Sequence, residues 1–470
     1  MTDASLFGEF SKVSAKEWKQ KIQYDLKGKD YNETLVWESV EGIQVKPFYT
    51  DEDVNEGTPF EIAKNHNWQI AQTIYVGDNK QANQKAHRAI ESGVERLIFT
   101  IVDASVSWEA LLSDIDLATT LLHLDFQFLD VAAVKTLLTF VDVKKANIHL
   151  NIDPLGHLAK TGNWFHSKEK DHHLLDEIYT LCQNRAEISI LSVDASRYQN
   201  TGANIVQQLA YALSHANEYL NHLDVTSSAV EKSLSVNFKV AIGGNYFFEI
   251  AKLRALRWLW KSLTSEYGID GACHILAVPS RRNKSVYDYN VNQLRTTTEC
   301  MAAILGGADT VCNLPYDALY KKDNEFSERL ARNQLLVLKN ESYFSEVAHA
   351  VNGTYYIETL TQQLAEKALL LFKQLEKGGG FLSNLKEGTI QRKTKESAEK
   401  EQRLYDSGEL PLVGSNVYQN DADKIQHELE LYPFVKTEKR KTVIEPIIEK
   451  RLAEALEQKR LVQEKTAKSK

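Results

Sequence analysis

The chain has 470 residues, 43% of them hydrophobic and 26% charged, and its formal net charge is −8. These proportions are ordinary for a soluble globular protein, and the length exceeds the usual limit of one hydrophobic core, so we expect one large domain with extensions, or two domains. The net acidity argues against nucleic acid as the main partner, although it still allows a local basic pocket.

The first residues and the cysteines bear on the cellular compartment. MTDASLFGEF contains an early acid and lacks both a basic and an apolar segment, which argues against a secretory signal. No run approaches the about 18 consecutive apolar residues of a membrane span. Cys182, Cys273, Cys300 and Cys312 lack CxxC spacing, which argues against a disulfide framework or a thiolate metal site. We expect a cytoplasmic protein.

Residues 1–60 are predicted to form an N-terminal arm that contacts a partner. The sequence Ser14-Ala-Lys-Glu17 is a capping box, and apolar residues then recur at every fourth position from Trp18 until Gly28 ends the helix. The following stretch, TLVWESVEGIQVKPFY, predicts two short strands around a Glu41-Gly42 turn. This segment has too little core to fold alone, so we expect it to lie on something larger.

Residues 61–350 are predicted to form an α/β fold, a (β/α)8 TIM barrel, because strand and helix patterns alternate there. Eight apolar or alternating runs predict the strands, namely WQIAQTIYV, RLIFTIVD, LHLDFQFLD, NIHLNID, EISILSV, SVNFKVAI, CHILAV and DTVCNL. Segments with helical periodicity lie between them, such as SWEALLSDIDLATTLL and GANIVQQLAYALSHANEYL. An open doubly wound sheet is the alternative, but no GxGxxG follows the first run, so the barrel is favoured.

Residues 351–470 are predicted to form a helical C-terminal extension. One long amphipathic helix is expected over residues 352–376, and Gly378-Gly-Gly380 should end it. Near Pro446, apolar residues recur at every fourth position, namely Ile444, Ile448, Leu452 and Leu456. This stripe predicts a second helix that packs along one side.

The stretch GGNYFFEIAKLRALRWLWKSL, residues 243–263, is the first candidate site. It places Glu249, Lys252, Arg254 and Arg257 within a few helical turns of one another. Its glycines follow a predicted strand, which is where barrel active sites lie. Large apolar residues nevertheless cover a wide arc of this helix, as is typical of an outer barrel helix, so a framework role is the favoured interpretation.

Two polar segments are weaker candidates. His166, His172 and His173 in HSKEKDHH lack a carboxylate or thiolate at ligand spacing, so no metal is expected there. The basic loop at residues 280–284, SRRNK, is a candidate phosphate site, but it has no glycine-rich cradle and a solvated loop is favoured. The chain contains no Gly-x-Ser-x-Gly elbow, Walker loop or His-Glu-x-x-His motif, so the residues alone give no convincing catalytic set.

Five longer motifs follow one another along the chain, namely NYFFEIAKLRALRWLW, RTTTECMAAILGGADT, ARNQLLVLKNES, NGTYYIETLTQQLAEKA and YDSGELPLVGSNVYQ. In content and order they resemble the methylmalonyl-CoA mutase family, whose barrel helices read Asn-Phe-Phe-Met-Glu-(Ile/Val)-Ala-Lys-Leu-Arg-Ala and Arg-Thr-x-x-Glu-Ala-Met-Ala-Ala. The N-terminal EWKQKIQYDLKG and EGIQVKPFYT are similar as well. The resemblance covers nearly the whole chain, to about Gln419.

The resemblance implies a reaction as well as a fold. In that family an acyl-CoA is threaded along the barrel axis, and a separate C-terminal domain binds adenosylcobalamin. Homolysis of the Co–C bond gives an adenosyl radical that abstracts hydrogen from the substrate, and the thioester group then migrates between succinyl-CoA and (R)-methylmalonyl-CoA. The cofactor supplies the radical chemistry, while the protein supplies orientation and excludes water.

The chain departs from the family's pattern at the reacting groups. The family's Trp-x-Ile-Arg-Gln-Tyr strand corresponds to Trp68-Gln-Ile-Ala-Gln-Thr73, so Thr73 stands in the place of the tyrosine. The family's Ser-Gly-Tyr-His becomes Asp194-Ala-Ser-Arg197, so Arg197 replaces the histidine that contacts the thioester. The His-x-Gln-Thr-Ser-Gly loop becomes VPSRRN. We find no Asp-x-His-x-x-Gly to supply a cobalt ligand, and too few residues follow the barrel for a cobalamin domain.

These departures predict the small, non-catalytic subunit of a heterodimeric methylmalonyl-CoA mutase, with no catalytic, cofactor-binding or metal-binding residue of its own. The partner is then the large catalytic subunit, which binds adenosylcobalamin and most of the acyl-CoA. Two alternatives stay open: an acyl-CoA mutase barrel that uses a separate cobalamin-binding subunit, and a non-enzyme that binds CoA esters.

Overall fold

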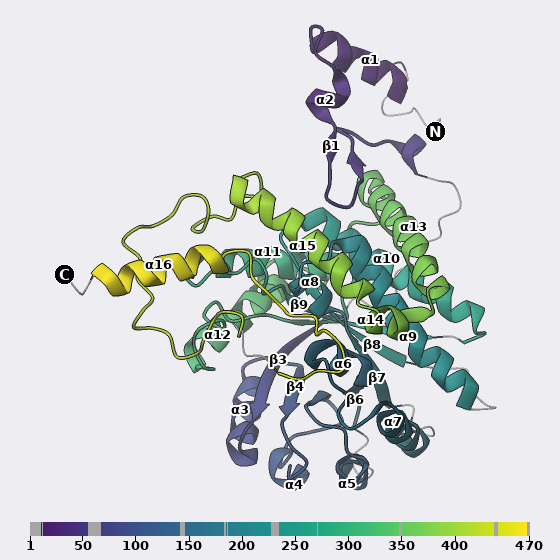
Figure 1. The fold of residues 1–470 in the computed structure, drawn as a ribbon, viewed down its shortest axis with the longest axis vertical. Coiled ribbons are helices and arrows are strands. Elements are labelled where there is room, and N and C mark those ends of the chain that lie inside the picture. The colour runs from purple at the N-terminus through teal and green to yellow at the C-terminus, as the bar shows by residue number, and fades with distance from the viewer. Residues whose placement is uncertain are drawn as a thin grey trace, which may run out of the picture.

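The structure, a computed structural model, describes residues 11, 13–54, 67–141, 146–182, 185, 187–226, 235–269, 271–346, 350–436 and 440–467. Its centre is a closed barrel of eight parallel strands in the order β10-β3-β4-β5-β6-β7-β8-β9 (Figure 1). The strands are β3 (Gln69–Val76), β4 (Arg96–Ile101), β5 (Leu121–Phe126), β6 (Ile148–Ile152), β7 (Ile188–Asp194), β8 (Ser235–Ile242), β9 (Ala272–Pro279) and β10 (Thr310–Cys312). Each coincides with one of the predicted runs, so the (β/α)8 barrel is confirmed.

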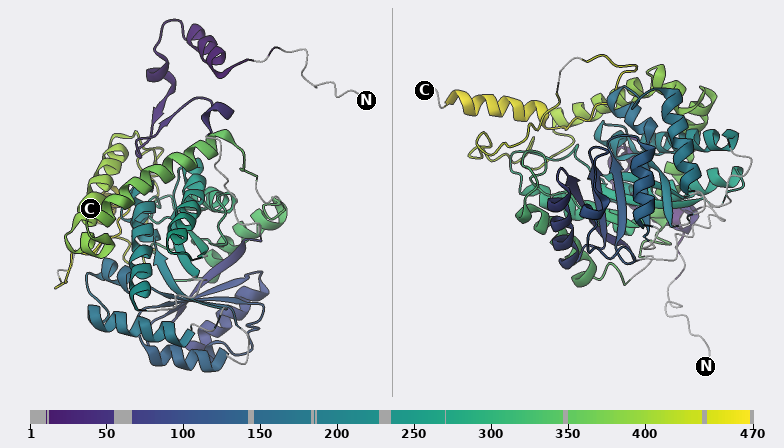
Figure 2. Two further views of the ribbon diagram at one scale, coloured as in Figure 1. Left: turned by 90° about the vertical axis from the view of Figure 1, so that its right-hand side faces the viewer. Right: turned by 90° about the horizontal axis from the view of Figure 1, so that it is seen from below.

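Helices between the strands form the outer layer of the barrel (Figures 1 and 2). They are α3 (Asn79–Glu91), α4 (Trp108–Leu111), α5 (Val131–Val141), α6 (Pro154–Thr161), α7 (Lys168–Cys182), α8 (Ser196–Asn200), α9 (Ile205–Thr226), α10 (Tyr246–Glu266), α11 (Val291–Leu305) and α12 (Glu325–Leu336). A π-helical turn, Val337–Glu341, continues α12. An apolar core fills the space between helices and strands, and Phe248, Ile250 and Leu253 of α10 are fully buried in it. Because both faces of each strand are covered, five of the six residues of β4 (RLIFTI) are buried and the sixth, Thr100, is half-buried.

The helix predicted over residues 107–122 is wrong for most of its length, since only α4 is helical there. Asp114 takes a positive φ of 55°, which ends helical geometry. The Asp116 carboxylate then accepts hydrogen bonds from the Ala118 N–H and the Thr119 hydroxyl. Short polar side chains of this kind compete with a helix for backbone groups, so the chain turns before β5 begins.

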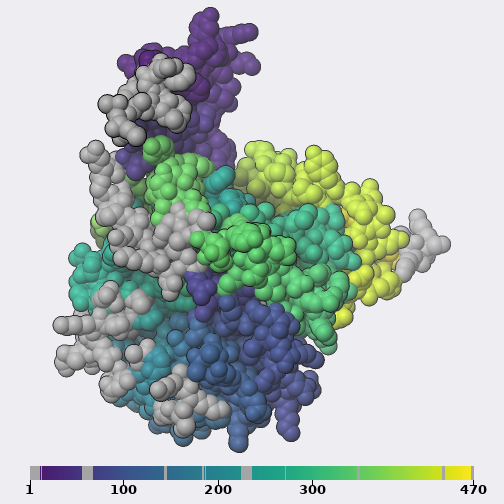
Figure 3. All heavy atoms as spheres, turned by 180° about the vertical axis from the view of Figure 1, so that it is seen from behind, coloured from purple at the N-terminus to yellow at the C-terminus, as the bar shows by residue number. Residues whose placement is uncertain are grey.

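The arm, residues 13–54, projects from the barrel at its helical end (Figures 1, 2 and 3) but packs on the barrel through Ile43, which is buried in the main core, and through Trp37, whose ring centroid lies 5.8 Å from that of Phe248. It contains α1 (Ala15–Asp25), α2 (Tyr31–Leu35), β1 (Trp37–Glu38), β2 (Gln44–Val45) and a 3₁₀ turn (Asp51–Asp53). The predicted capping box is confirmed, because the Glu17 N–H donates to Ser14 Oγ at 3.2 Å and the Ser14 N–H donates to Glu17 Oε2 at 2.8 Å. The predicted hairpin is confirmed by the antiparallel pairing of β1 with β2.

The elements beyond the barrel are α13 (Tyr355–Lys377), α14 (Gly380–Lys386), α15 (Thr389–Ser407) and α16 (Glu454–Ala467). The long helix predicted for residues 352–376 corresponds to α13, and left-handed glycines at 379 and 380 end it. This helix packs on α9 and α10, and there Glu358 forms a 2.6 Å ion pair with the buried Arg254. Among the described residues, none of the helices is both long and apolar enough to cross a membrane.

Residues 440–453, which we call the strap, are not helical. The helix predicted for the apolar stripe near Pro446 is therefore wrong over these residues, and a helix begins only with α16. The strap crosses the carboxyl end of the barrel and passes α6 as the yellow trace in Figure 1. Its N–H groups donate to backbone carbonyls of segments that follow β6, β7 and β9, namely those of Ala159, Gly162, Asn200 and Arg282. These carbonyls replace the partners that an α-helix would have supplied.

Gly162 is required where the strap crosses α6. Its φ of +77° lies in the left-handed region, and a Cβ at this position would stand 2.7 Å from the Ile444 carbonyl oxygen. A real Cβ atom essentially never approaches an oxygen so closely, so glycine permits both the turn and the close contact.

Candidate functional site

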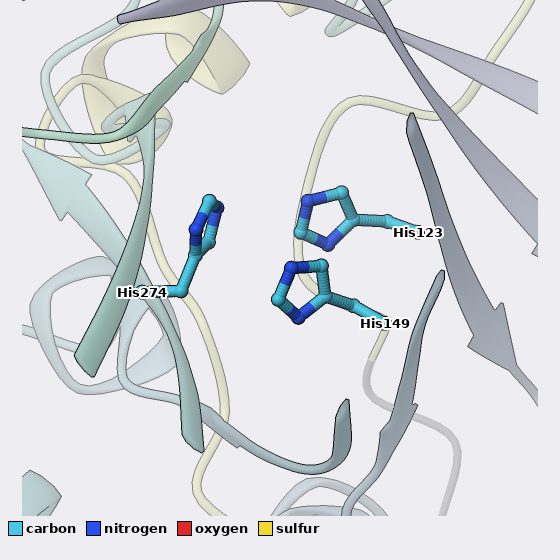
Figure 4. Close-up of side chains that lie close together, drawn as sticks. All are labelled: His123, His149 and His274. Carbon is cyan, nitrogen blue, oxygen red and sulfur yellow. The ribbon is translucent and has the colours of Figure 1, made fainter. Parts of the chain in front are cut away.

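The interior of the barrel holds a layer of large polar side chains near the amino ends of the strands. Alternate residues of each strand face the axis. The members of this interior layer are Arg96 of β4, His123 of β5, His149 of β6 and His274 of β9. Figure 4 shows the three imidazoles pointing toward one another. His123 is fully buried, and Arg96 and His149 are nearly so.

Arg96 connects this layer. Its Nη1 lies 2.8 Å from His123 Nε2 and 3.4 Å from His274 Nε2, while its Nε and Nη2 donate to Gln69 Oε1 at 2.9 and 2.6 Å. A guanidinium can only donate, so His123 Nε2 accepts and the proton of that imidazole lies on Nδ1.

The imidazoles also close the barrel axis. The ring centroids of His123 and His149 lie 4.5 Å apart and the rings are stacked, and those of His149 and His274 lie 4.6 Å apart. Because β6 and β9 are not neighbours in the barrel, the second contact runs across the axis. Side chains therefore fill the interior at this level, as is usual in a packed barrel core.

Burial keeps these imidazoles neutral. It lowers the pKa of His149 to about 3 and, together with the neighbouring imidazole and guanidinium groups, holds the pKa of His123 and His274 well below the ordinary value. Burial also lowers the pKa of Arg96, to about 10. At neutral pH the layer therefore consists of three uncharged rings around one guanidinium cation.

The three imidazoles resemble a metal centre in their spacing, since one nitrogen of each lies within 4.8 Å of the others. The Arg96 guanidinium, however, already contacts two of the three rings and places a positive charge where a metal cation would bind. The interior layer therefore suits its own guanidinium better than a metal ion.

Thr73 and Arg197, the two positions singled out from the sequence, line the same cavity at the carboxyl end of the barrel. This cavity has a volume of about 410 Å³. Thr73 Oγ1 lies 3.5 Å from the Cys312 thiol. Arg197, in α8, is buried and donates to Asp194 Oδ2 at 3.0 Å and to Glu449 Oε1 of the strap at 3.5 Å. The structure thus brings the two positions together, with a short hydroxyl at one and a paired cation at the other.

Further charges surround this cavity. Lys239 Nζ lies 3.4 Å from Asp125 Oδ2, and that carboxylate raises the pKa of Lys239. Burial opposes ionisation of Asp194, but Lys239 and Arg197 outweigh it and lower the pKa of that carboxyl. These groups are fixed charges, unlike the neutral donors that could polarise a thioester carbonyl.

The charged residues of α10 belong to the framework of the barrel. The framework role that was favoured from the sequence is therefore confirmed for this helix. Lys252 is buried, donates to the Ala241 carbonyl at 2.7 Å and to Gln199 Oε1 at 2.8 Å, and pairs with Glu249. Arg254 is buried beneath α13. These charges therefore hold α10 against its neighbours and do not face water.

The three histidines of HSKEKDHH do not converge. His166 Nε2 contacts the Leu129 carbonyl at 3.2 Å, and His172 Nδ1 contacts the Lys168 carbonyl at 2.7 Å. His173 is exposed on the surface of α7. Each ring has its own local surroundings, so the arrangement does not resemble a shared ligand set.

Ser280, Arg282 and Lys284 of the basic loop are buried and Arg281 is exposed, so the interpretation of residues 280–284 as a solvated loop is wrong for most of its length. Lys284 forms a buried ion pair with Glu299 at 2.8 Å, and Arg282 donates to the Lys450 carbonyl of the strap at 2.8 Å. The strap and α15 both contact the loop through Arg282, whose Nε pairs with Glu401 of α15 at 2.5 Å. Of the loop's side chains, that of Arg281 lines the cavity at the carboxyl end of the barrel.

Sequence reasoning missed the interior layer. A signal was present, because LLHLDF, NIHLNI and ACHILA each place one histidine between two aliphatic residues or a cysteine and an aliphatic residue of a strand. An isolated polar residue in a strand that is covered on both faces must be paired with something buried. The runs are apolar on both faces, however, so they do not indicate which residues point to the axis.

The amino-acid sequence was compared with family models and with the sequences of known proteins, and both comparisons give matches to methylmalonyl-CoA mutases. The family model described as methylmalonyl-CoA mutase matches residues 98–467. The methylmalonyl-CoA mutase small subunit of Porphyromonas gingivalis is 33% identical over 497 residues, covering 99% of this chain and 79% of that protein. The small subunit of Streptomyces virginiae is 30% identical, covering 82% of this chain and 67% of that protein. The large subunit of the same organism is 26% identical, covering 87% and 61%. The chain therefore belongs to the methylmalonyl-CoA mutase family.

Proposed function

We propose that this chain is the small, non-catalytic subunit of a heterodimeric, adenosylcobalamin-dependent methylmalonyl-CoA mutase. The large subunit would interconvert succinyl-CoA and (R)-methylmalonyl-CoA. The observation that carries the proposal is the filled barrel axis, where His149 and His274 meet. An acyl-CoA that is threaded along the axis in a catalytic barrel would have to displace these rings and Arg96, which are held by packing and hydrogen bonds.

The residues at the carboxyl end of the barrel support the same function. A migrating thioester needs neutral donors within reach of its carbonyl oxygen, which are the roles of the tyrosine and histidine in catalytic chains. Thr73 lacks the reach of a tyrosine, and its hydroxyl lies against Cys312. Arg197 is engaged by Asp194 and Glu449. Neither side chain is suited to activate a thioester.

The described residues at this end of the barrel do not fit adenosylcobalamin. The strap crosses the face against which a corrin ring would have to lie, and backbone hydrogen bonds to Gly162 and Asn200 hold it there. His157, the histidine among the described residues that line the two cavities at this end, is stacked on Phe165 with ring centroids 3.6 Å apart. Burial lowers the pKa of His157 to about 4. We therefore assign the cofactor to the large subunit.

The arm is the proposed contact with the large subunit. Trp18, Tyr24 and Trp37 are 51%, 79% and 52% exposed, although large aromatic side chains are normally covered. Exposed aromatics on a projecting element are typical of protein interfaces, and Figure 3 shows the arm in purple above the rest of the molecule. We divide the chain into an arm (1–60), a barrel (61–350) and a helical extension (351–470). The first boundary, near residue 60, lies outside the described residues.

The test is co-expression of this chain with a large subunit. We expect an equimolar complex by size-exclusion chromatography with light scattering, and mutase activity in the complex. The double variant Trp18→Ala/Tyr24→Ala should weaken association at least about tenfold, because buried interface aromatics dominate binding energy. Tyr418→Ala is the matched control, since Tyr418 is 85% exposed and lies outside the arm.

Two results would contradict the proposal. One is a large subunit that is equally stable and active without this chain. The other is mutase activity of the purified chain when adenosylcobalamin and succinyl-CoA are supplied.

A further inference from the structure

Two cavities meet over the carboxyl end of the barrel. The one lined by Thr73 has a volume of about 410 Å³, and a second, beside β5 and β6, has a volume of about 390 Å³. The residues that line both, which we call the mouth site, are Thr100, Lys160, Asp194, Arg197, Lys239 and Arg281. Four of the six are cations and one is an acid, in a chain whose net charge is −8. Positive charge is therefore concentrated where the cavities join.

Two of these cations have acidic partners. Lys239 lies 3.4 Å from Asp125, and Arg197 lies 3.0 Å from Asp194 and 3.5 Å from Glu449. These carboxylates keep the side chains of Lys239 and Arg197 in place at the cavity wall. Among the described residues, the two cations of the mouth site without such an acidic partner are Lys160 and Arg281.

Lys160 and Arg281 both have exposed side chains that line the two cavities. Within the part of the chain that the structure describes, no acceptor is found within hydrogen-bonding distance of either side chain, although the Arg281 backbone N–H donates to Asn200. The Lys160 ammonium is partly removed from water and lies near the Arg197 guanidinium, and both effects lower the pKa of Lys160. The mouth site thus contains cations that repel one another.

We propose that the mouth site binds a small oxyanion, a carboxylate or a phosphate group, held by Lys160 and Arg281 with Arg197 behind them. Ammonium and guanidinium groups form charge-assisted hydrogen bonds with both oxyanions. An excess of cations at the junction of the two cavities also attracts counter-ions. Each cavity lies at the lower end of the about 300–1,000 Å³ of small-molecule sites, so a small molecule fits better than a long acyl-CoA. This inference does not depend on the proposed function.

Glu449 allows the proposal to be tested in both directions. Its carboxylate extends from the strap toward Arg197 Nη1 and neutralises part of the positive charge of the site. A bound anion must share Arg197 with this carboxylate, so removing the charge of Glu449 should strengthen binding. Removing the charge of Lys160 or Arg281 should weaken it.

The experiment is calorimetric titration of the full chain with sodium phosphate or sodium succinate at constant ionic strength, with sodium chloride as the reference. Lys160→Gln and Arg281→Gln should each weaken binding about tenfold, and Glu449→Gln should strengthen it about threefold. The matched controls are Lys21→Gln in α1 and Glu396→Gln in α15, which remove the same charges from exposed ion pairs elsewhere. Melting temperatures in sodium chloride show whether each variant is folded.

Saturable binding of phosphate alone identifies a phosphate ligand, and binding of succinate alone identifies a carboxylate. Either result, or binding of both, supports the mouth site if the variants change affinity in the stated directions. The proposal is overturned if neither anion binds more tightly than chloride, or if Lys21→Gln weakens binding as much as Lys160→Gln does. Neither of these failures affects assembly with a large subunit, so the two proposals can be judged separately.

Discussion

Lowering the pH from 7 to 5.5 should destabilise the barrel through the three histidines that meet on its axis. Burial lowers the pKa of His149 to about 3 and holds the pKa of His123 and His274 well below their ordinary value of 6.5. The unfolded chain therefore binds protons below about pH 6.5 that the folded chain cannot bind. The stability that depends on these neutral rings is complete above about pH 6.5 and is lost as the pH falls below it.

The size of the effect follows from the unfolded pKa. At pH 5.5 each shielded histidine lowers the free energy of unfolding by about 1.4 kcal/mol, because that pH lies one unit below an unfolded pKa of about 6.5. Three such residues together remove about 4 kcal/mol, out of the about 5–15 kcal/mol by which folded domains are stable. The melting temperature should fall by about 8–16 °C, at about 2–4 °C per kcal/mol for a domain of this size.

The assay is urea unfolding at pH 7.0 and pH 5.5, followed by tryptophan fluorescence, for the wild-type chain and two variants. His149→Asn should lose about 1.3 kcal/mol less than the wild type between the two pH values. His173→Asn, at an exposed position in α7, should behave as the wild type. His157, whose pKa burial lowers to about 4, contributes equally in all three proteins and cancels in the comparison. If His149→Asn loses as much stability as the wild type, His149 is not shielded and the axis is open to water.

Three further predictions concern the framework, the strap and the barrel axis. Arg254→Met should lower the free energy of unfolding by about 3 kcal/mol, because Glu358 loses its partner at a buried ion pair; a loss below about 1 kcal/mol in urea titrations would refute that role. Gly162→Ala should make residues 440–453 more sensitive to limited proteolysis, whereas Gly408→Ala, with a similar φ of +82° and nothing near the added Cβ, should not; equal cleavage of both variants would speak against the close contact. Calorimetric titration of the Lys160→Gln/Arg281→Gln double variant with succinyl-CoA at high ionic strength should give no binding heat, because the axis is filled and the mouth site has lost two of its cations; saturable binding would show that an acyl-CoA can enter the barrel.

Most of the fold could be predicted because the relevant signals are local. The short RLIFTI run contains β-branched and aromatic residues, which favours a covered strand, and the glycines after Lys377 favour the end of a helix. The capping box at Ser14 needs only four residues to satisfy its backbone groups. Signals of this kind do not depend on which distant segments later come into contact.

The interior layer and the strap could not be predicted for the opposite reason. His149 and His274 lie far apart in the sequence, and their contact depends on the curvature of a closed sheet. The apolar stripe that includes Ile444 suits a helix equally well, and the extended form wins because carbonyls such as that of Gly162 offer partners there. Comparison with the family's motifs located Thr73 and Arg197, but it could not reveal that Arg197 would pair with Glu449 of the strap.

The strap also implies an order of events during synthesis. The ribosome releases all eight strands long before residues 440–453 exist, and domains generally begin to fold from their N-terminal parts. Until those last residues emerge, the carbonyls of Ala159, Gly162 and Asn200 can be satisfied only by water. During synthesis, the nascent chain therefore passes through a state in which all barrel strands are present but the strap does not yet cover the carboxyl end. A premature stop codon before residue 440 would make that state permanent.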